Sequence, residues 1–508
     1  EGCLVQSSGR YGTIKNENLA ISEVGRRLMR VTKRKRVGLR GMQIGVFLAC
    51  VLGVVGLGWC QNLGGGYGGT GYLIKNASTV LTMDPSRGDR SLLGLLENAD
   101  VLIVGDRIAA VGNLKLPPNL VRVIDGRGMV VMPGFVDTHD HLWQSVIRGC
   151  GTDKDWFARC VSPLFSKTFH FSEADAYALV RLSTTDLIET GVTTVTDWSH
   201  SFNDDFVRGN LEALNDSGLR YAFGMGFHPS DYPTELDIKN AKHQFIDPNP
   251  LGSLQIAGLV SAKDGLMTGE VNVAKDLGVK LHVHLLENPD PCLLPTPACR
   301  TSFKILNDAH ALELGPDFIA AHVLHLIPDE ITQLKNNHNS VSHQPLSNMR
   351  LGTGIMPYND FETAGIPIGL GLDGGTNDTA DFFNNMRAAT GLQRALTTNP
   401  SASPTVAEIL RVATLGGAEV LGMDKKIGSL IPGKQADVIV IDMNMVNFAP
   451  VLKPAAQLVF NGQPQNVKWV FVAGRALKAN GNVTGVNERQ VVYAAQKAAG
   501  DVTPLLNP

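Results

Sequence analysis

The chain has 508 residues, of which 44% are apolar and 18% are charged, and its formal net charge is −3. These values are typical of a globular protein and provide no basic excess for phosphate backbones, which argues against nucleic acid as a partner. The 54 glycines and 26 prolines lie scattered between apolar runs and form no repeat, as expected of an enzyme with many tight strand-to-helix turns.

The first 70 residues differ from the rest of the chain. A cluster of Lys and Arg after Met29 is followed by an uncharged apolar stretch from Met42 to Trp59 and then by polar, glycine-rich sequence. This layout predicts an export signal, and therefore a periplasmic or extracellular protein. Two alternatives stay open: an uncleaved membrane anchor, which needs about 18 apolar residues, and a cytoplasmic protein with neither. We interpret residues 1–28 as sequence upstream of a true start at Met29.

From residue 71 to 133 the sequence predicts short β-strands between Gly, Asp and Asn turns, and the same pattern occurs again within residues 426–508. We predict that these flanks pair into a small β-sandwich, followed by a C-terminal tail. Residues 134–425 alternate short strands with longer helical stretches, and strands that are apolar on both faces indicate a parallel sheet. The predicted fold is therefore α/β, a (β/α)8 TIM barrel with reactive residues at the carboxyl ends of its strands.

Histidines occur where two of the predicted strands end. His139 and His141 follow an apolar run, and because alternate residues of a strand share a face, both imidazoles would reach one point. His282 and His284 form a second such pair, of which we expect one to be a ligand. We choose His284, because it lies nearer the strand end and Glu287 follows it, where a carboxylate can carry protons.

Two further strand ends complete the pattern. His322 follows a short apolar strand, and Asp373 follows another, between glycines that would let its carboxylate approach a metal closely. Asp373 alone could equally be a helix cap or a turn residue. The order of the whole set is much less expected by chance than any one member.

Seven motifs between about Gly71 and Val483 carry a family resemblance. They are, in order, VMPGFVDTHDHLWQ, GVTTVTDW, HLLE, AAHVLHLIPDEI, SHQPLSNMRLGTGIMP, GLGLDGGTND and IGSLIPGKQADVIVID. The set resembles the amidohydrolase superfamily, and within it the branch of cytosine and guanine deaminases, methylthioadenosine/S-adenosylhomocysteine deaminases and triazine hydrolases. The resemblance implies hydrolysis of a non-peptide C–N bond, most simply deamination of an aminopurine, aminopyrimidine, adenosine-like compound or triazine, with release of ammonia or an amine.

The same resemblance implies roles for individual residues. One divalent ion, zinc by preference with iron or manganese as alternatives, would be bound by His139, His141, His284 and Asp373. Glu287 would be the proton shuttle, His322 would polarise the substrate or hold the attacking water, and Asp373 would also accept a proton. The positions expected to face the substrate are Gln144, Trp156 and His343.

Two rival functions are weighed against this interpretation. A two-metal enzyme of the dipeptidase or N-acyl amino acid hydrolase type needs a lysine at the tip of the fourth strand, where Lys263 is the candidate; a solvated turn residue is the simpler interpretation. A catalytically inactive binding protein should lack a ligand or the shuttle, and this chain has all of them. The expected partners are a small-molecule substrate, a second copy in a homo-oligomer, and a membrane only through an uncleaved N-terminal segment.

The cysteines leave one further question open. Cys150, Cys160, Cys292 and Cys299 lie in the body of the chain, and none has the CxxC spacing of a metal knuckle. In an exported protein Cys292 and Cys299 could form a disulfide, whereas four free thiols are expected in the cytosol.

Overall fold

The computed structural model describes residues 71–115, 121–150, 160–165, 170–290, 301–374 and 379–506. The predicted export signal, Trp156, Cys292 and Cys299 lie outside these residues. None of the helices in the described ranges combines the length and the apolar character needed to cross a membrane.

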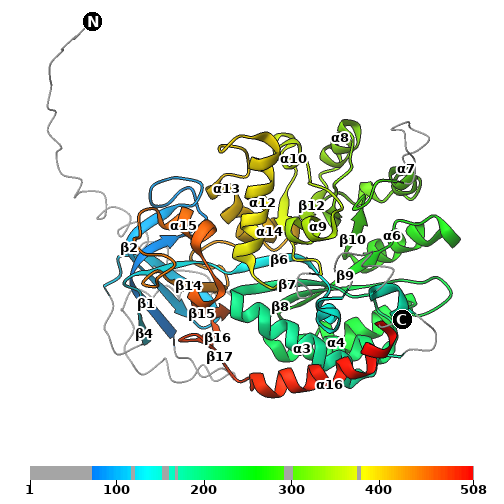
Figure 1. The fold of residues 1–508 in the computed structure, drawn as a ribbon, viewed down its shortest axis with the longest axis horizontal. Helices are drawn as coiled ribbons and strands as arrows, with labels where there is room; N and C mark the ends of the chain where they lie inside the picture. The colour runs from blue at the N-terminus through cyan, green and yellow to red at the C-terminus, as the bar shows by residue number, and fades with distance from the viewer. Residues whose placement is uncertain are drawn as a thin grey trace, which may run out of the picture. The chain divides into compact units, whose positions relative to one another are not determined.

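Eight parallel strands form the predicted barrel (Figure 1). In chain order they are β6 (Phe135–Asp140), β7 (Val192–Trp198), β8 (Arg220–Met225), β9 (Gly252–Gly258), β10 (Lys280–Leu285), β11 (Phe318–His322), β12 (Ser340–His343) and β13 (Ile368–Leu370). Every residue of β6, β7 and β8 is buried, as expected for strands enclosed on both faces. The prediction of a TIM barrel is confirmed.

Helices alternate with these strands and cover them on the outside (Figure 1). The longer ones are α3 (Glu173–Thr190), α4 (Asp204–Ser217), α6 (Leu266–Leu277), α8 (Pro328–Asn336) and α12 (Phe382–Thr397). Local signals set their ends: the Ser172 side chain accepts the Asp175 N–H before α3, and Gly191 ends that helix in the left-handed conformation. The ends of a helix such as α3 are thus set by identifiable residues in the sequence.

A second sheet joins the two flanks of the barrel, as predicted. Its nine strands are β1 (Gly71–Leu81), β2 (Leu95–Val104), β3 (Arg107–Gly112), β4 (Val121–Asp125), β5 (Met129–Pro133), β14 (Val438–Asp442), β15 (Val467–Val472), β16 (Arg475–Ala479) and β17 (Asn482–Val483). The N-terminal strand β5 pairs antiparallel with the C-terminal strand β14, so the two flanks form one mixed sheet.

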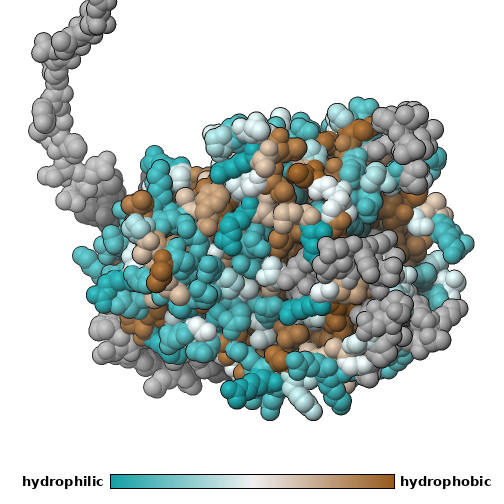
Figure 2. Space-filling view, viewed as in Figure 1, coloured by the Kyte–Doolittle hydropathy of each residue, from teal (hydrophilic) through white to brown (hydrophobic). Residues whose placement is uncertain are grey.

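Two contacts fasten the flanking elements to the barrel. Arg220, at the start of β8, donates to both carboxylate oxygens of Asp437, at 2.9 and 3.1 Å, and both side chains are buried. The last helix, α16 (Glu488–Leu506), packs Ala495 and Ala498 into an apolar cluster that includes Leu179 of α3. The outward side of α16 is largely hydrophilic (Figure 2).

Candidate metal centre

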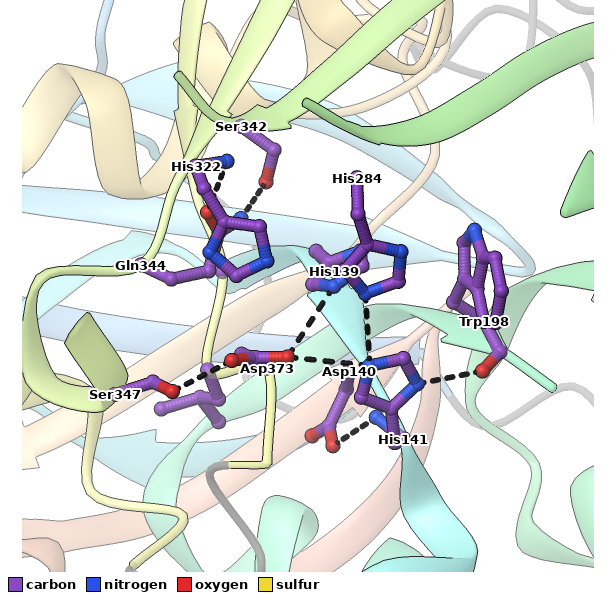
Figure 3. A network of polar contacts seen from close by, with 12 residues as sticks. His139, Asp140, His141, Trp198, His284, His322, Ser342, Gln344, Ser347 and Asp373 are labelled. Carbon is purple, nitrogen blue, oxygen red and sulfur yellow. Dashed lines mark hydrogen bonds and ion pairs between the residues drawn. The ribbon is translucent and has the colours of Figure 1, made fainter. Parts of the chain in front are cut away.

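The four predicted ligands converge at the carboxyl end of the barrel (Figure 3). His139 lies in β6 and His141 just after it, His284 lies in β10, and Asp373 follows β13. One donor atom of each lies within 4.8 Å of the other three. The Asp373 Oδ1 atom is 3.3 Å from His139 Nε2 and 3.2 Å from His141 Nε2, and 3.2 Å separates the Nε2 atoms of His141 and His284.

The closure of the barrel holds three of these ligands in place. β6 and the segment after β13 are joined by hydrogen bonds from the Asp373 N–H to the His139 carbonyl, at 2.7 Å, and from the His141 N–H to the Asp373 carbonyl, at 3.0 Å. A Cβ on Gly371 would lie 2.9 Å from the His139 carbonyl oxygen, so only glycine fits this close approach. Asp373 itself has a φ of 63°, a strained value for a residue with a side chain.

The protonation states match a cation site. Burial lowers the pKa of His139 to about 3 and that of His284 well below its ordinary value, so both rings are neutral. Burial alone would raise the pKa of Asp373, but the contacts of its carboxylate with the His139 and His141 rings hold it well below the usual range. The buried His139 Nε2 makes no hydrogen bond within the described residues. The pKa of the third ring, His141, is lowered by burial but raised overall by its contact with Asp373. Imidazole nitrogens and an ionised carboxylate are donors that zinc prefers, so these residues fit a divalent ion.

Buried carboxyl groups support the strands that carry these ligands. Asp137 Oδ1 accepts the N–H groups of His139 and Leu372, both at 3.1 Å, and Asp140 Oδ1 accepts that of His141 at 2.6 Å. Burial raises the pKa of Asp137 to about 8 and that of Asp140 well above its ordinary value. Their role is to fix the backbone of the ligand-bearing strand ends.

Glu287 and His322 lie beside the ligands. Together with Asp373 they form a second group whose donor atoms lie within 4.8 Å of one another, and Glu287 Oε2 is 4.0 Å from His322 Nε2. Burial raises the pKa of Glu287, partly offset by His322. The His322 backbone N–H donates to Gln344 Oε1 at 2.8 Å, and its φ is 69°. A carboxyl group and an imidazole therefore flank the point where the ligands meet.

Helix α9 (Pro345–Leu351) supplies two contacts that the sequence did not identify. Ser347 Oγ donates to Asp373 Oδ2 at 2.5 Å, and the Asn348 side-chain amide lies 3.1 Å from His322 Nδ1. Both residues belong to the SHQPLSN motif, from which only His343 was selected. A short polar run at a strand-to-helix turn was the available signal.

The structure describes two of the three residues predicted to face the substrate, and also the lysine of the two-metal alternative. Gln144 is buried in the 3-10 turn after His141, and its Oε1 has no hydrogen-bond partner among the described residues. His343 ends β12 with its ring beside Tyr358. Lys263, the candidate for a two-metal site, is exposed in a 3-10 turn and belongs to neither group of metal-binding side chains found among the described residues. Contacts of Gln144 and His343 with a substrate stay predictions.

A disulfide joins Cys150 to Cys160, a pairing that the sequence analysis did not propose. The two cysteines bracket the segment between the 3-10 turn η3 (Leu142–Ile147) and the turn η5 (Ser162–Phe165). Cys160 is buried in the apolar cluster that also holds Trp143 and Ile147 of η3. The crosslink therefore ties down the chain immediately after His141.

Comparison with known proteins gives a consistent set of similarities. The model of the amidohydrolase family matches residues 130–477. A 5'-deoxyadenosine deaminase of Methanobrevibacter smithii is 30% identical over 422 residues, which cover 78% of this chain and 92% of that protein. A 5-methylthioadenosine/S-adenosylhomocysteine deaminase of Pelotomaculum thermopropionicum is 28% identical, with 84% and 98% covered. A solved variant of atrazine chlorohydrolase from Arthrobacter aurescens TC1, complexed with zinc and atraton, superposes with a TM-score of 0.74 at 24% identity, with 84% of this chain and 100% of that chain covered.

Proposed function

Because the chain belongs to the amidohydrolase family, we propose that it is a zinc-dependent deaminase whose substrates are adenine nucleosides altered at the 5' position. It acts on a C–N bond other than a peptide bond, in an amino-heterocycle. The observation that carries the proposal is the convergence of three imidazoles and one carboxylate beside Glu287 and His322. The nucleoside class is supported by the deaminases that share about 30% of their residues with most of this chain.

A divalent cation in this site would supply a nucleophile by making water acidic near neutral pH. Asp373 uses Oδ2 to accept from Ser347, which leaves Oδ1 directed at His139 and His141. This arrangement keeps the carboxylate ionised and able to accept a proton during attack on the ring carbon.

Glu287 and His322 handle the leaving nitrogen. Burial raises the pKa of the half-buried Glu287, which favours a carboxyl group that holds a proton and gives it to the departing amine. The Asn348 side-chain amide lies 3.1 Å from His322 Nδ1, and as a donor there it leaves a ring hydrogen on Nε2, on the side of Glu287. That N–H can donate to the negative charge that develops in the tetrahedral intermediate.

The test is a panel assay on purified protein loaded with zinc. The panel contains 5'-deoxyadenosine, 5'-methylthioadenosine, S-adenosylhomocysteine, adenosine, cytosine, guanine and an aminotriazine, and ammonia release is measured. We expect one ammonia per adenine nucleoside consumed, with the highest kcat/KM for a 5'-altered nucleoside. A preference for cytosine, guanine or the triazine would contradict the proposed nucleoside class. No turnover of any panel member by metal-loaded protein would contradict deamination.

We also propose that the chain is exported. The basic cluster and apolar stretch before residue 60 support this, and so does the Cys150–Cys160 disulfide, because such bonds persist in oxidising compartments. Cell fractionation with N-terminal sequencing should find a mature chain that begins after Trp59. A cytoplasmic chain with a free Cys150 thiol would contradict the proposal.

A further inference from the structure

A buried chain of hydrogen bonds leads from the metal ligand His139 across the barrel interior. We propose that Gln255 and His282 are positioning residues that fix the tautomer and orientation of His139, and that Trp198 connects this relay to His141. The inference rests on the proposed function only in that the four ligands hold a divalent ion.

The relay consists of two side-chain hydrogen bonds between buried groups. His139 Nδ1 lies 3.1 Å from His282 Nε2, and His282 Nδ1 lies 3.2 Å from Gln255 Oε1. All three side chains are buried. β6, which carries His139, is not a neighbour of β9 or β10, so the contact between His139 and His282 crosses the inside of the barrel.

The chemistry of the terminal group sets the direction of every proton. An amide oxygen only accepts, so His282 must donate from Nδ1, and its Nε2 is then left with a lone pair. That lone pair accepts the hydrogen on His139 Nδ1. The His139 Nε2 lone pair is consequently free, and it is this atom that lies 3.3 Å from Asp373 Oδ1, where the other ligands meet.

Trp198 brings two more ligands into the same network. Its carbonyl accepts from His141 Nδ1 at 2.7 Å, which leaves the Nε2 lone pair of that ring for the metal (Figure 3). Its indole N–H donates to the His282 carbonyl at 3.0 Å, and its ring meets the His284 ring edge-on with centroids 4.5 Å apart. Trp198 therefore contacts His141 and His284 while it holds the strand segment that carries His282.

Such support has a predictable effect on metal binding. A neutral imidazole without a partner exchanges between two tautomers and rotates, whereas one hydrogen-bonded at Nδ1 presents Nε2 at all times. Outer partners of ligating histidines typically change metal affinity 10–100-fold. A residue with a purely structural role would lower stability without changing the affinity or the geometry of the metal.

The experiment compares two buried glutamines. Gln255→Leu removes the terminal acceptor, Gln255→Glu keeps one, and Gln393→Leu removes a buried amide that bonds only the Met356 carbonyl, at 2.7 Å, among the described residues. Co²⁺ affinity is measured by chelator competition, together with the visible absorption spectrum of the Co²⁺ protein. We expect Gln255→Leu to bind Co²⁺ roughly 10–100-fold more weakly with an altered spectrum, and the other two variants to resemble the wild type.

Wild-type affinity and spectrum in a folded Gln255→Leu protein would overturn the relay. If that variant does not fold, ¹⁵N-histidine NMR of the wild type decides: the relay requires the proton on Nδ1 of both His139 and His282, and a proton on Nε2 of either ring would overturn it. A wild type that binds no Co²⁺ would instead contradict the proposed function, while the tautomers still report on the relay.

Discussion

Replacing Glu287 by Gln tests the proton shuttle without disturbing the metal ligands. Glutamine has the same shape and keeps an oxygen acceptor toward His322, whose Nε2 lies 4.0 Å away, but it cannot take up or give a proton. Positioned acid–base groups contribute about 10²–10⁴-fold in rate, which corresponds to about 2.7–5.4 kcal/mol of transition-state stabilisation. We expect kcat to fall by about 10²–10⁴-fold.

The site geometry predicts that metal binding changes little in this variant. Glu287 belongs with His322 and Asp373 and is not one of the four ligands, so zinc content should stay at the wild-type value. The assay is initial-rate ammonia release, with metal content measured by mass spectrometry on the same samples.

Glu270→Gln is the matched control, because Glu270 is another glutamate whose pKa burial raises. Its side chain accepts from the Leu259 N–H, at 2.9 Å, and it belongs to neither group of metal-binding side chains in the described part of the chain. This control should retain kcat within about twofold, since its amide oxygen can still accept that hydrogen bond. A Glu287→Gln enzyme with wild-type kcat and full metal content would refute the shuttle.

Three further predictions concern stability. Burial raises the pKa of Glu270 from 4.5 to about 8, so between these pH values the folded chain holds a proton that the unfolded chain has lost. Glu270 therefore lowers the free energy of unfolding as pH rises, by up to about 1.4 kcal/mol per pH unit. In urea titrations at pH 5 to 8, Glu270→Gln should reduce the slope by this amount. Arg220→Met leaves Asp437 buried without its cation and should lower the free energy of unfolding, measured in urea, by about 3–5 kcal/mol. The double variant with Asp437→Asn should recover part of this loss, and a loss below about 1 kcal/mol in the single variant would show that the pair contributes little. Replacing Cys150 and Cys160 by Ser opens a loop with a sequence separation of 10 and should lower the free energy of unfolding by about 3 kcal/mol. Reduction of the wild type should have the same effect, and equal stability of the oxidised and reduced wild type would contradict the crosslink.

The ligand set was predictable because it depends on local pattern. Each ligand follows an apolar run, and the carboxyl ends of parallel strands in a barrel meet at one face, so His139, His284 and Asp373 could be brought together without coordinates. The choice of His284 over His282 from its place nearer the strand end agrees with the geometry, in which His284 and not His282 belongs to the four-residue group.

The support for the ligands was not predictable, because it depends on contacts between strands that are not neighbours. Gln255 carries no motif, and its partner His282 is identified only by which residues face each other inside the barrel. Trp198 reaches His141 through its carbonyl, a group that every residue has. The Cys150–Cys160 pairing likewise depends on the apolar cluster in which Cys160 packs with Trp143 and Ile147, which spacing alone does not fix.

Metal stoichiometry tests the central claim most directly. The purified chain should be stripped with a chelator, reloaded with zinc, dialysed and analysed beside an Asp373→Ala variant treated identically. We expect about one zinc per wild-type chain and almost none in the variant, because the variant lacks the only carboxylate of the four-ligand group. Two ions per chain, or one ion retained equally by both proteins, would contradict the account.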